Sequence, residues 1–260
     1  MLFELTLSTI LFLVLAAFFA GFVDSIAGGG GLIQLPALLI GLPKSETVTV
    51  LGTNKFASVF GTTTAAALYR RQIKPEPKAL IAMALPAFFG SMAGAALASR
   101  LPTDAMRPIV FVLLIAVALY TWRKPELGAI ELLRNSSKKH HLIAIGAGLV
   151  IGFYDGIFGP GTGSFLMLIL VAGLGYAFIS ASAIAKVVNV STNVAAIIVF
   201  GLHGVILWKL GLLMAASNVS GAIVGSRLAI KGGSTLVRKV FLLVTLALIV
   251  KVGIDTFATL

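Results

Sequence analysis

The chain has 260 residues, of which 58% are hydrophobic and 11% charged, whereas soluble domains carry about 25% charged residues. It has no cysteine, and its three histidines lack metal-ligand spacing, so we expect neither disulfides nor a metal centre or other cofactor. The net charge of +11 comes from loop lysines and arginines, a pattern typical of membrane topology rather than nucleic-acid binding, so we expect an integral membrane protein with the lipid bilayer as its solvent.

Ten apolar segments follow one another along the chain. Eight approach the roughly 20 residues that a crossing helix needs, and they lie near 5–23, 47–69, 77–99, 103–122, 142–155, 179–202, 205–230 and 236–257. Two shorter runs, 31–42 and 163–174, each follow a glycine cluster. The predicted fold is all-α and polytopic, with about 8–10 membrane segments. A first half, 1–122, and a second half, 142–260, are joined by a polar cytoplasmic linker, 123–141.

The two halves are predicted to be an internal duplication. GFVDSIAGGG at 21–30 aligns with GFYDGIFGPG at 152–161, an offset of 131 residues, and the same offset places Lys55 on Lys186. Each half contains five segments. Whether 5–42 makes two crossings or a re-entrant hairpin, the number of crossings per half is odd, so the two copies should be inverted in the membrane. A single broken crossing through 5–42 would make that number even, but 5–23 is long enough to span alone.

The distribution of basic residues supports the same topology. If each half has an odd number of crossings, twelve basic loop residues lie on one side of the membrane and four on the other. The side with twelve is then the cytoplasmic one, and both termini lie outside. The first set is Arg70, Arg71, Lys74, Lys78, Arg123, Lys124, Arg134, Lys138, Lys139, Lys231, Arg238 and Lys239, and the second is Lys44, Arg100, Arg107 and Lys209. Arg227, near a helix end, is expected to extend to the cytoplasmic interface.

Two lysines inside predicted spans are the first candidate site residues. An ionisable group at membrane depth is costly and usually marks a pathway or a paired site, and Lys55 and Lys186 are repeat equivalents. Polar residues follow each lysine on the same helical face: Ser58 and Thr62 in the first half, Asn189 and Asn193 in the second. Two interpretations stay open, a cavity lined by these side chains or structural Lys–Asp pairs with close helix packing.

The glycine clusters at 27–31 and 158–163 are the second candidate. Glycine and proline interrupt the helix there, and backbone released at membrane depth must face protein or a watery cavity. Such breaks present free N–H groups to anions; the alternative is a tight turn. Asp24 and Asp155 precede the clusters and could cap the next helix, pair with a lysine, or take up a proton. GSMAG (90–94) and GAIVG (221–225) are expected to be close helix contacts.

These motifs resemble the sulfite exporter TauE/SafE family of membrane transporters, also called TSUP, over about residues 11–260. The resemblance implies passage of sulfite, sulfonates, sulfoacetate or similar anions across the bacterial cytoplasmic membrane. The motif positions it carries over are Asp24, Gly28, Gly29, Gly30, Gly31, Asn54 and Lys55 in the first copy, and Asp155, Gly159, Gly161, Thr162, Gly163 and Lys186 in the second. Asn54 has Ala185 as its repeat equivalent, so a symmetric asparagine pair is not expected.

The sequence thus predicts a transporter that binds a small anion near the membrane midplane between the repeats. Lysine charge and glycine N–H groups would bind the anion, and proton coupling would run through Asp24 or Asp155. A carrier of small carboxylates and a non-transporting assembly subunit are the alternatives. Enzyme motifs are lacking: the sequence has no GxSxG elbow and no adjacent carboxylates in a span. Nucleic acid is not an expected partner, and the oligomeric state is left open.

Overall fold

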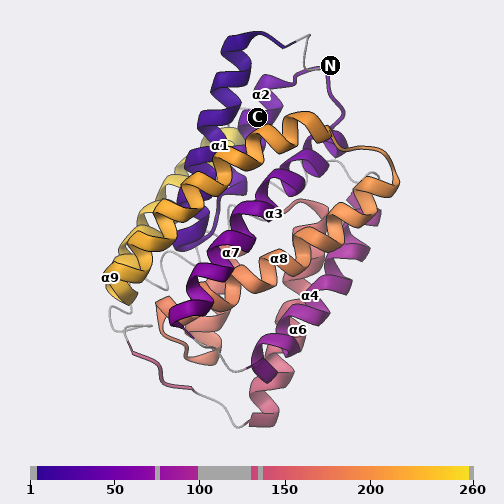
Figure 1. The fold of residues 1–260 in the computed structure, drawn as a ribbon. Coiled ribbons are helices and arrows are strands. Elements are labelled where there is room, and N and C mark those ends of the chain that lie inside the picture. Colours follow the sequence, from indigo (N-terminus) through magenta and orange to yellow (C-terminus); the bar gives the residue numbers. More distant parts are fainter. Residues whose placement is uncertain (1–4, 74–76, 99–129, 134–136, 258–260) are drawn as a thin grey trace.

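The computed structural model describes residues 5–73, 77–98, 130–133 and 137–257, and every regular element in these ranges is a helix. The prediction of an all-α fold is confirmed. The elements are α1 (Leu7–Ala27), α2 (Gly31–Gly41), α3 (Thr47–Gln72), α4 (Pro77–Ala98), α6 (Ser137–Ile157), α7 (Thr162–Leu168), η3 (Ile169–Leu174), α8 (Phe178–Leu202) and α9 (Trp208–Phe257) (Figure 1). The predicted segment 103–122 and most of the linker 123–141 lie outside the described residues.

Five of the described helices are long and apolar enough to cross a membrane: α1, α4, α6, α8 and α9. The 26-residue helix α3 is long enough but too polar for this group, because it contains Lys55, Asn54 and several threonines. Helix α9 covers the predicted segment 205–230 from residue 208 onward and all of 236–257, and Gly233 (φ 60°, ψ −163°) interrupts the helix between them. Helix α6 begins before the predicted position 142, because its first turn is formed by the polar residues that end the linker.

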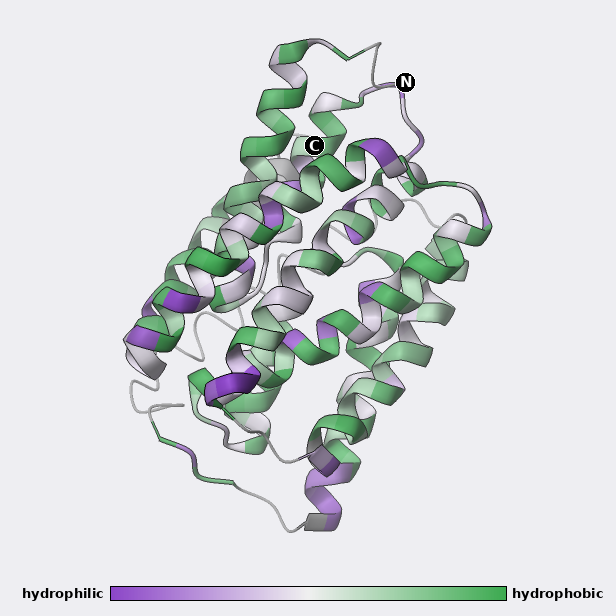
Figure 2. Cartoon of the chain, in the orientation of Figure 1, coloured by the Kyte–Doolittle hydropathy of each residue, from purple (hydrophilic) through white to green (hydrophobic). Residues whose placement is uncertain are grey.

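The outward surfaces of the bundle suit contact with lipid. Leu11, Leu15 and Phe19 on α1 are each 54–59% exposed. Apolar residues cover most of the outward helix faces, whereas polar ones gather at helix ends such as the start of α6 and at a few inner positions (Figure 2). In water such surfaces would be unfavourable, but in a bilayer the hydrocarbon chains cover them.

The first glycine cluster turns the chain back on itself, so that α1 and α2 form a helical hairpin. Helix α2 has 11 residues, about 16 Å of helix, so it cannot cross a membrane alone. A Cβ on Gly30 would lie 2.6 Å from the Asp24 side chain, and one on Gly41 would lie 3.0 Å from Leu13. Helix α2 therefore starts beside the end of α1 and runs back along it.

The helix boundaries follow the repeat. Helices α1, α2, α3 and α4 begin at residues 7, 31, 47 and 77, and α6, α7, α8 and α9 begin at 137, 162, 178 and 208. Each pair is therefore separated by 130 or 131 residues, as the sequence offset requires. The duplication accordingly extends from sequence to secondary structure, whereas the inverted orientation in the membrane stays a prediction.

The two halves exchange helices. Helix α1 packs extensively against α9 of the second half, and α4 of the first half packs against α6. Glycines allow both contacts. A Cβ on Gly90 would lie 2.3 Å from the carbonyl oxygen of Leu149, and one on Gly221 would lie 2.0 Å from that of Phe18. The prediction that the two GxxxG motifs mediate close helix contacts is confirmed, and the contacts are repeat equivalents of each other.

Candidate functional site

The two glycine-rich breaks meet inside the bundle. A Cβ on Gly163, at the start of α7, would lie 2.6 Å from the Cα atom of Gly28, just after α1. Only two backbones without side chains can approach so closely. The tips of the two hairpins are therefore in direct contact, one from each half of the chain.

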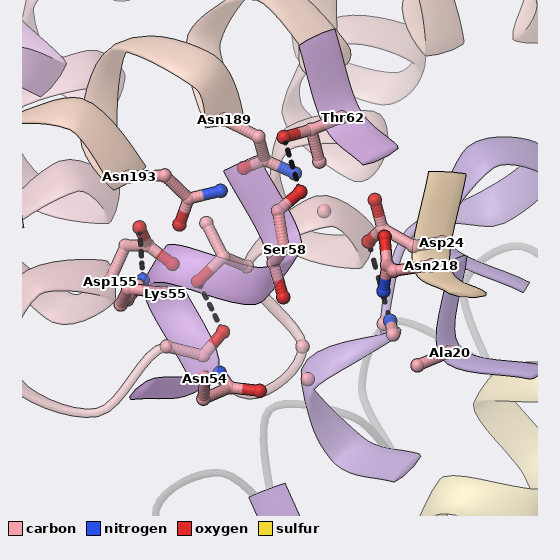
Figure 3. Close-up of a pocket in the computed structure, with 17 residues that line it drawn as sticks. Ala20, Asp24, Asn54, Lys55, Ser58, Thr62, Asp155, Asn189, Asn193 and Asn218 are labelled. Atoms are coloured by element: carbon pink, nitrogen blue, oxygen red, sulfur yellow. Dashed lines mark hydrogen bonds and ion pairs between the residues drawn. The ribbon is translucent and has the colours of Figure 1, made fainter. Parts of the chain in front are cut away.

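A polar cavity lies at this junction, between the two hairpins and helices α3, α8 and α9 (Figure 3). About 40 Å³ of it is open to the centre of a water-sized molecule, enough for roughly three waters or an anion of a few heavy atoms. Its lining residues are Ala20, Asp24, Gly29, Gly30, Gly31, Asn54, Lys55, Ser58, Thr62, Asp155, Gly159, Gly161, Thr162, Gly163, Asn189, Asn193 and Asn218.

The structure brings together all but two of the site residues predicted from the sequence. Lys186 does not line the cavity, because its side chain is fully buried and directed to Asp24. Gly28 is also absent from the lining, because it packs against the backbone of Gly163. The polar stripe on α3, the two asparagines of α8 and the remaining glycines all face the cavity.

Both lysines form ion pairs across the repeats. Lys55 Nζ lies 2.6 Å from Asp155 Oδ2, and Lys186 Nζ lies 2.9 Å from Asp24 Oδ2 and also donates to the main-chain oxygen of Asp24. Each lysine thus pairs with the aspartate of the other half. The two interpretations left open by the sequence are both realised, because the lysines pair with aspartates while Lys55 and the polar residues that follow each lysine line a cavity. Both ammonium charges are therefore compensated, and the two pairs add no net charge.

The two aspartates differ in their surroundings. The Asp24 side chain is 17% exposed, whereas that of Asp155 is 5% exposed. Asp24 Oδ1 also accepts a hydrogen bond from the backbone N–H of Gly30 at 3.3 Å. Asp24 therefore pairs with a lysine, one of the roles that the sequence left open, and also accepts the N–H of the residue that precedes α2. It is the more accessible carboxylate of the two.

Gly159 is required for the approach of Lys55. Its φ of +86° lies in the left-handed region, and a Cβ there would lie 2.9 Å from Lys55 Nζ. Any larger residue would be strained and would crowd the ammonium group.

Backbone N–H groups supply donors at the cavity. Within the described chain, the N–H groups of Gly29, Gly31, Gly161 and Gly163 donate no hydrogen bond, and all four residues line the cavity. Buried N–H groups are nearly always paired. Four such groups at one cavity therefore indicate water or a ligand with several acceptor atoms.

Two asparagines supply further unsatisfied polar atoms. Asn54 and Asn189 are 5% and 6% exposed, and the Oδ1 atom of each is buried with no hydrogen-bond partner in the described structure. The oxygen and nitrogen of an amide are exchanged by a half-turn of the side chain, and which end faces a ligand is set by the ligand. Both amides can therefore donate N–H groups to an anion in the cavity.

Sequence reasoning missed Asn218, Gln34 and Ala20. Asn218 donates to Gln34 Oε1 at 2.9 Å, and Gln34 in turn donates to the main-chain oxygen of Asn54 and to Ser58 Oγ at 3.3 and 3.4 Å. These buried amides hold the cavity-facing part of α3 against α2 and α9. The signal was present, because an amide inside an apolar segment is unusual. Their repeat equivalents, Ala87 and Phe165, gave no matching pattern.

The chain is similar in sequence to a known family of membrane transporters. The family model described as "Sulfite exporter TauE/SafE" matches residues 13–252. A "Probable membrane transporter protein ORF9" from Sinorhizobium sp. is 42% identical over 97% of this chain and 95% of its own length. A "Probable membrane transporter protein" from Haemophilus influenzae is 35% identical, covering 96% and 95%. "Probable membrane transporter protein YfcA" from Escherichia coli K12 is 36% identical, covering 94% and 89%. No solved structure matches the chain.

Proposed function

The chain belongs to the sulfite exporter TauE/SafE family of membrane transporters, and from this premise we propose that it carries a small sulfur-containing oxyanion, such as sulfite or a sulfonate, across the bacterial cytoplasmic membrane. The observation that carries the proposal is the cavity at the crossing of the two glycine breaks, where unpaired N–H groups and buried amides converge.

Because both lysines are paired with aspartates, the cavity would recognise an anion by hydrogen bonds rather than by a free ammonium group. Lys55 and Lys186 are each neutralised by an aspartate, so an anion would be attracted by N–H dipoles and by amides. A hydrogen bond to a charged group contributes about 1.5–3 kcal/mol, so three or four bonds can hold an anion without trapping it. Binding of this kind suits a transporter, which must also release its substrate.

The arrangement of donors favours a head group with three oxygens. The free N–H groups come from two hairpins, and the amides of Asn54 and Asn189 come from α3 and α8. A pyramidal sulfite or tetrahedral sulfonate has acceptor lone pairs in several directions, whereas a carboxylate has its two oxygens in one plane. This difference separates the proposal from the alternative of a small-carboxylate carrier.

The proposal places the anion site near the membrane midplane. If the repeats are inverted, their pseudo-two-fold axis lies in the membrane plane, and features that meet across it lie at mid-depth. The hairpin tips meet at Gly28 and Gly163, and the Lys–Asp pairs are exchanged between the halves. Both observations support an axis through the cavity.

Proton coupling is assigned to Asp24 rather than to Asp155. Asp24 lines the cavity, is the more exposed carboxylate, and faces Lys186 from α8. Protonation would free Lys186 from its partner at the same junction that holds the anion.

The test of proton coupling through Asp24 is anion uptake driven by a pH gradient. A double variant, Asp24→Asn with Lys186→Met, should lose the gradient dependence while still exchanging anion. The matched double variant at Asp155 and Lys55 should keep the dependence.

Transport itself is tested with purified protein reconstituted in liposomes. Uptake of labelled sulfite should exceed uptake of acetate, and excess sulfite, but not excess acetate, should compete. Asn189→Ala should weaken sulfite binding about tenfold, the loss of one charge-assisted hydrogen bond. Ser191→Ala is the control, because Ser191 lies on the same helix and bonds to Ala84 instead of lining the cavity. Liposomes that take up neither anion would favour the assembly-subunit alternative, and uptake of acetate in preference to sulfite would favour the carrier of small carboxylates.

A further inference from the structure

A second concave site lies away from the polar cavity, where the end of α3 meets the middle of α9. It is lined by Leu68, Arg71, Gln72, Arg227, Ile230 and Lys231. Residues 68, 71 and 72 lie on one face of α3, and residues 227, 230 and 231 lie on one face of α9. Two helices from different halves of the chain thus direct three cationic residues to one pocket.

These three cations are uncompensated. All three residues are exposed, and within the described part of the chain none of Arg71, Arg227 and Lys231 forms an ion pair. Three positive charges at one pocket repel one another unless an anion lies between them. Arg71 and Arg227 carry planar guanidinium groups, which bind phosphate oxygens in pairs.

The surface next to the pocket is apolar. Val224 and Leu228, one turn before Arg227 and Lys231 on α9, are 50% and 42% exposed, and Leu68 and Ile230 form part of the pocket wall. A ligand seated here would have a charged group among the cations and would find hydrocarbon-compatible surface directly beside it. That combination matches a phospholipid, with its phosphate in the pocket and an acyl chain along α9.

The internal repeat supplies a comparison within the same molecule. The offset of 131 residues places Leu202 at the position of Arg71 and Ala96 at the position of Arg227. The equivalent place in the other half therefore lacks two of the three cations. The pocket lies at the end of the bundle that the basic-residue distribution assigns to the cytoplasm. The cytoplasmic leaflet is the one whose anionic lipids attract basic groups at the interface.

From these observations we infer that the pocket between α3 and α9 binds the phosphate group of an anionic phospholipid of the cytoplasmic leaflet. The site is separate from the anion cavity and independent of what the protein transports. It joins the end of α3, the helix that carries Lys55, to α9 just before its break at Gly233. A lipid held there would tie the two halves together at this face.

The test is lipid binding to the purified full chain in detergent, followed by native mass spectrometry and thermal unfolding. The probes are short-chain phosphatidylglycerol, phosphatidylcholine of the same chain length, and inorganic phosphate. Phosphatidylglycerol should bind at least tenfold more tightly than phosphatidylcholine and should raise the unfolding temperature. The double variant Arg71→Gln with Arg227→Gln should lose at least tenfold of this affinity.

Arg70→Gln is the matched control, because Arg70 is exposed on the same turn of α3 but does not line the pocket. It should bind phosphatidylglycerol like the wild type. If the double variant is not recovered folded, Lys231→Gln alone should give a smaller loss in the same direction. Equal binding by the Arg70 variant and the pocket variants would overturn the inference, because any surface charge would then suffice. Full competition by inorganic phosphate at the lipid's own concentration would overturn the lipid as the occupant.

Discussion

Removing the charge of Lys55 should destabilise the protein by leaving Asp155 without its partner. Both side chains are at most 5% exposed, and their charged atoms are 2.6 Å apart. At that distance and an effective dielectric constant of about 20, the attraction is about 6 kcal/mol. Part of it is offset by the cost of burying both ions, and removing one partner of a buried pair typically costs about 3–5 kcal/mol. We expect Lys55→Met to fall in that range.

The second substitution separates a structural pair from a ligand-binding charge. Asp155→Asn added to Lys55→Met removes the stranded carboxylate, so the double variant should recover most of the lost stability. The assay is unfolding of detergent-purified protein by heat and by denaturant, with sulfite affinity measured on the same samples. A lysine variant as stable as the wild type, or a double variant no more stable than the single one, would refute the reasoning. A hundredfold loss of sulfite affinity in a stable double variant would show that the ammonium group contacts the anion.

Three further predictions follow from the helix contacts, the cavity and the topology. Gly152→Ala should lower the stability by at least about 2 kcal/mol through overpacking, because the new Cβ would lie 2.3 Å from the carbonyl oxygen of Ala87. Thermal unfolding measures this loss of stability. Gly159→Ala should reduce sulfite transport and cost about 1–2 kcal/mol, because φ is +86° and the new Cβ would crowd Lys55. Cysteine placed at Lys44 should react with an impermeant thiol reagent added outside intact cells, while cysteine at Arg71 should be protected.

Each of these predictions has an internal control. Gly146→Ala should be neutral or slightly stabilising, since nothing lies within 4 Å of its Cβ position. Gly204 has a φ of +69° in open space, so Gly204→Ala should show the backbone strain alone and leave transport intact. Equal losses at Gly152 and Gly146 would contradict the close-contact argument. Protection of both cysteines from outside would contradict the assigned topology.

Much of the fold followed from two sequence signals, hydropathy and the offset of 131 residues. Apolar length located the described helices, and glycine clusters located the breaks before α2 and α7. Hydropathy alone predicts α3 only weakly as a membrane helix, because several of its residues are polar and line the cavity. The repeat compensated for this, since α3 aligns with the more apolar α8.

The partners of the candidate site residues could not be predicted in the same way. Lys55 and Asp155 are 100 residues apart, and only the exchange of helices between the halves brings them together. The sequence therefore left capping, pairing and proton uptake open for the aspartates. Asn218 and Gln34 were missed for a related reason: they have no polar equivalents in the other half, so the repeat gave them no support.

The exchange of helices also sets the order in which the protein can assemble. Helix α1 leaves the ribosome before its main partner α9, which begins about 180 residues after α1 ends. At about 5–20 residues per second, α1 waits roughly ten to forty seconds in the membrane for that contact. During this time the face of α1 that will contact α9 is open to lipid or to an insertion factor. Two polypeptides split in the linker should each insert but stay incomplete until they meet, because among the described helices the most extensive contacts of one half are made with helices of the other.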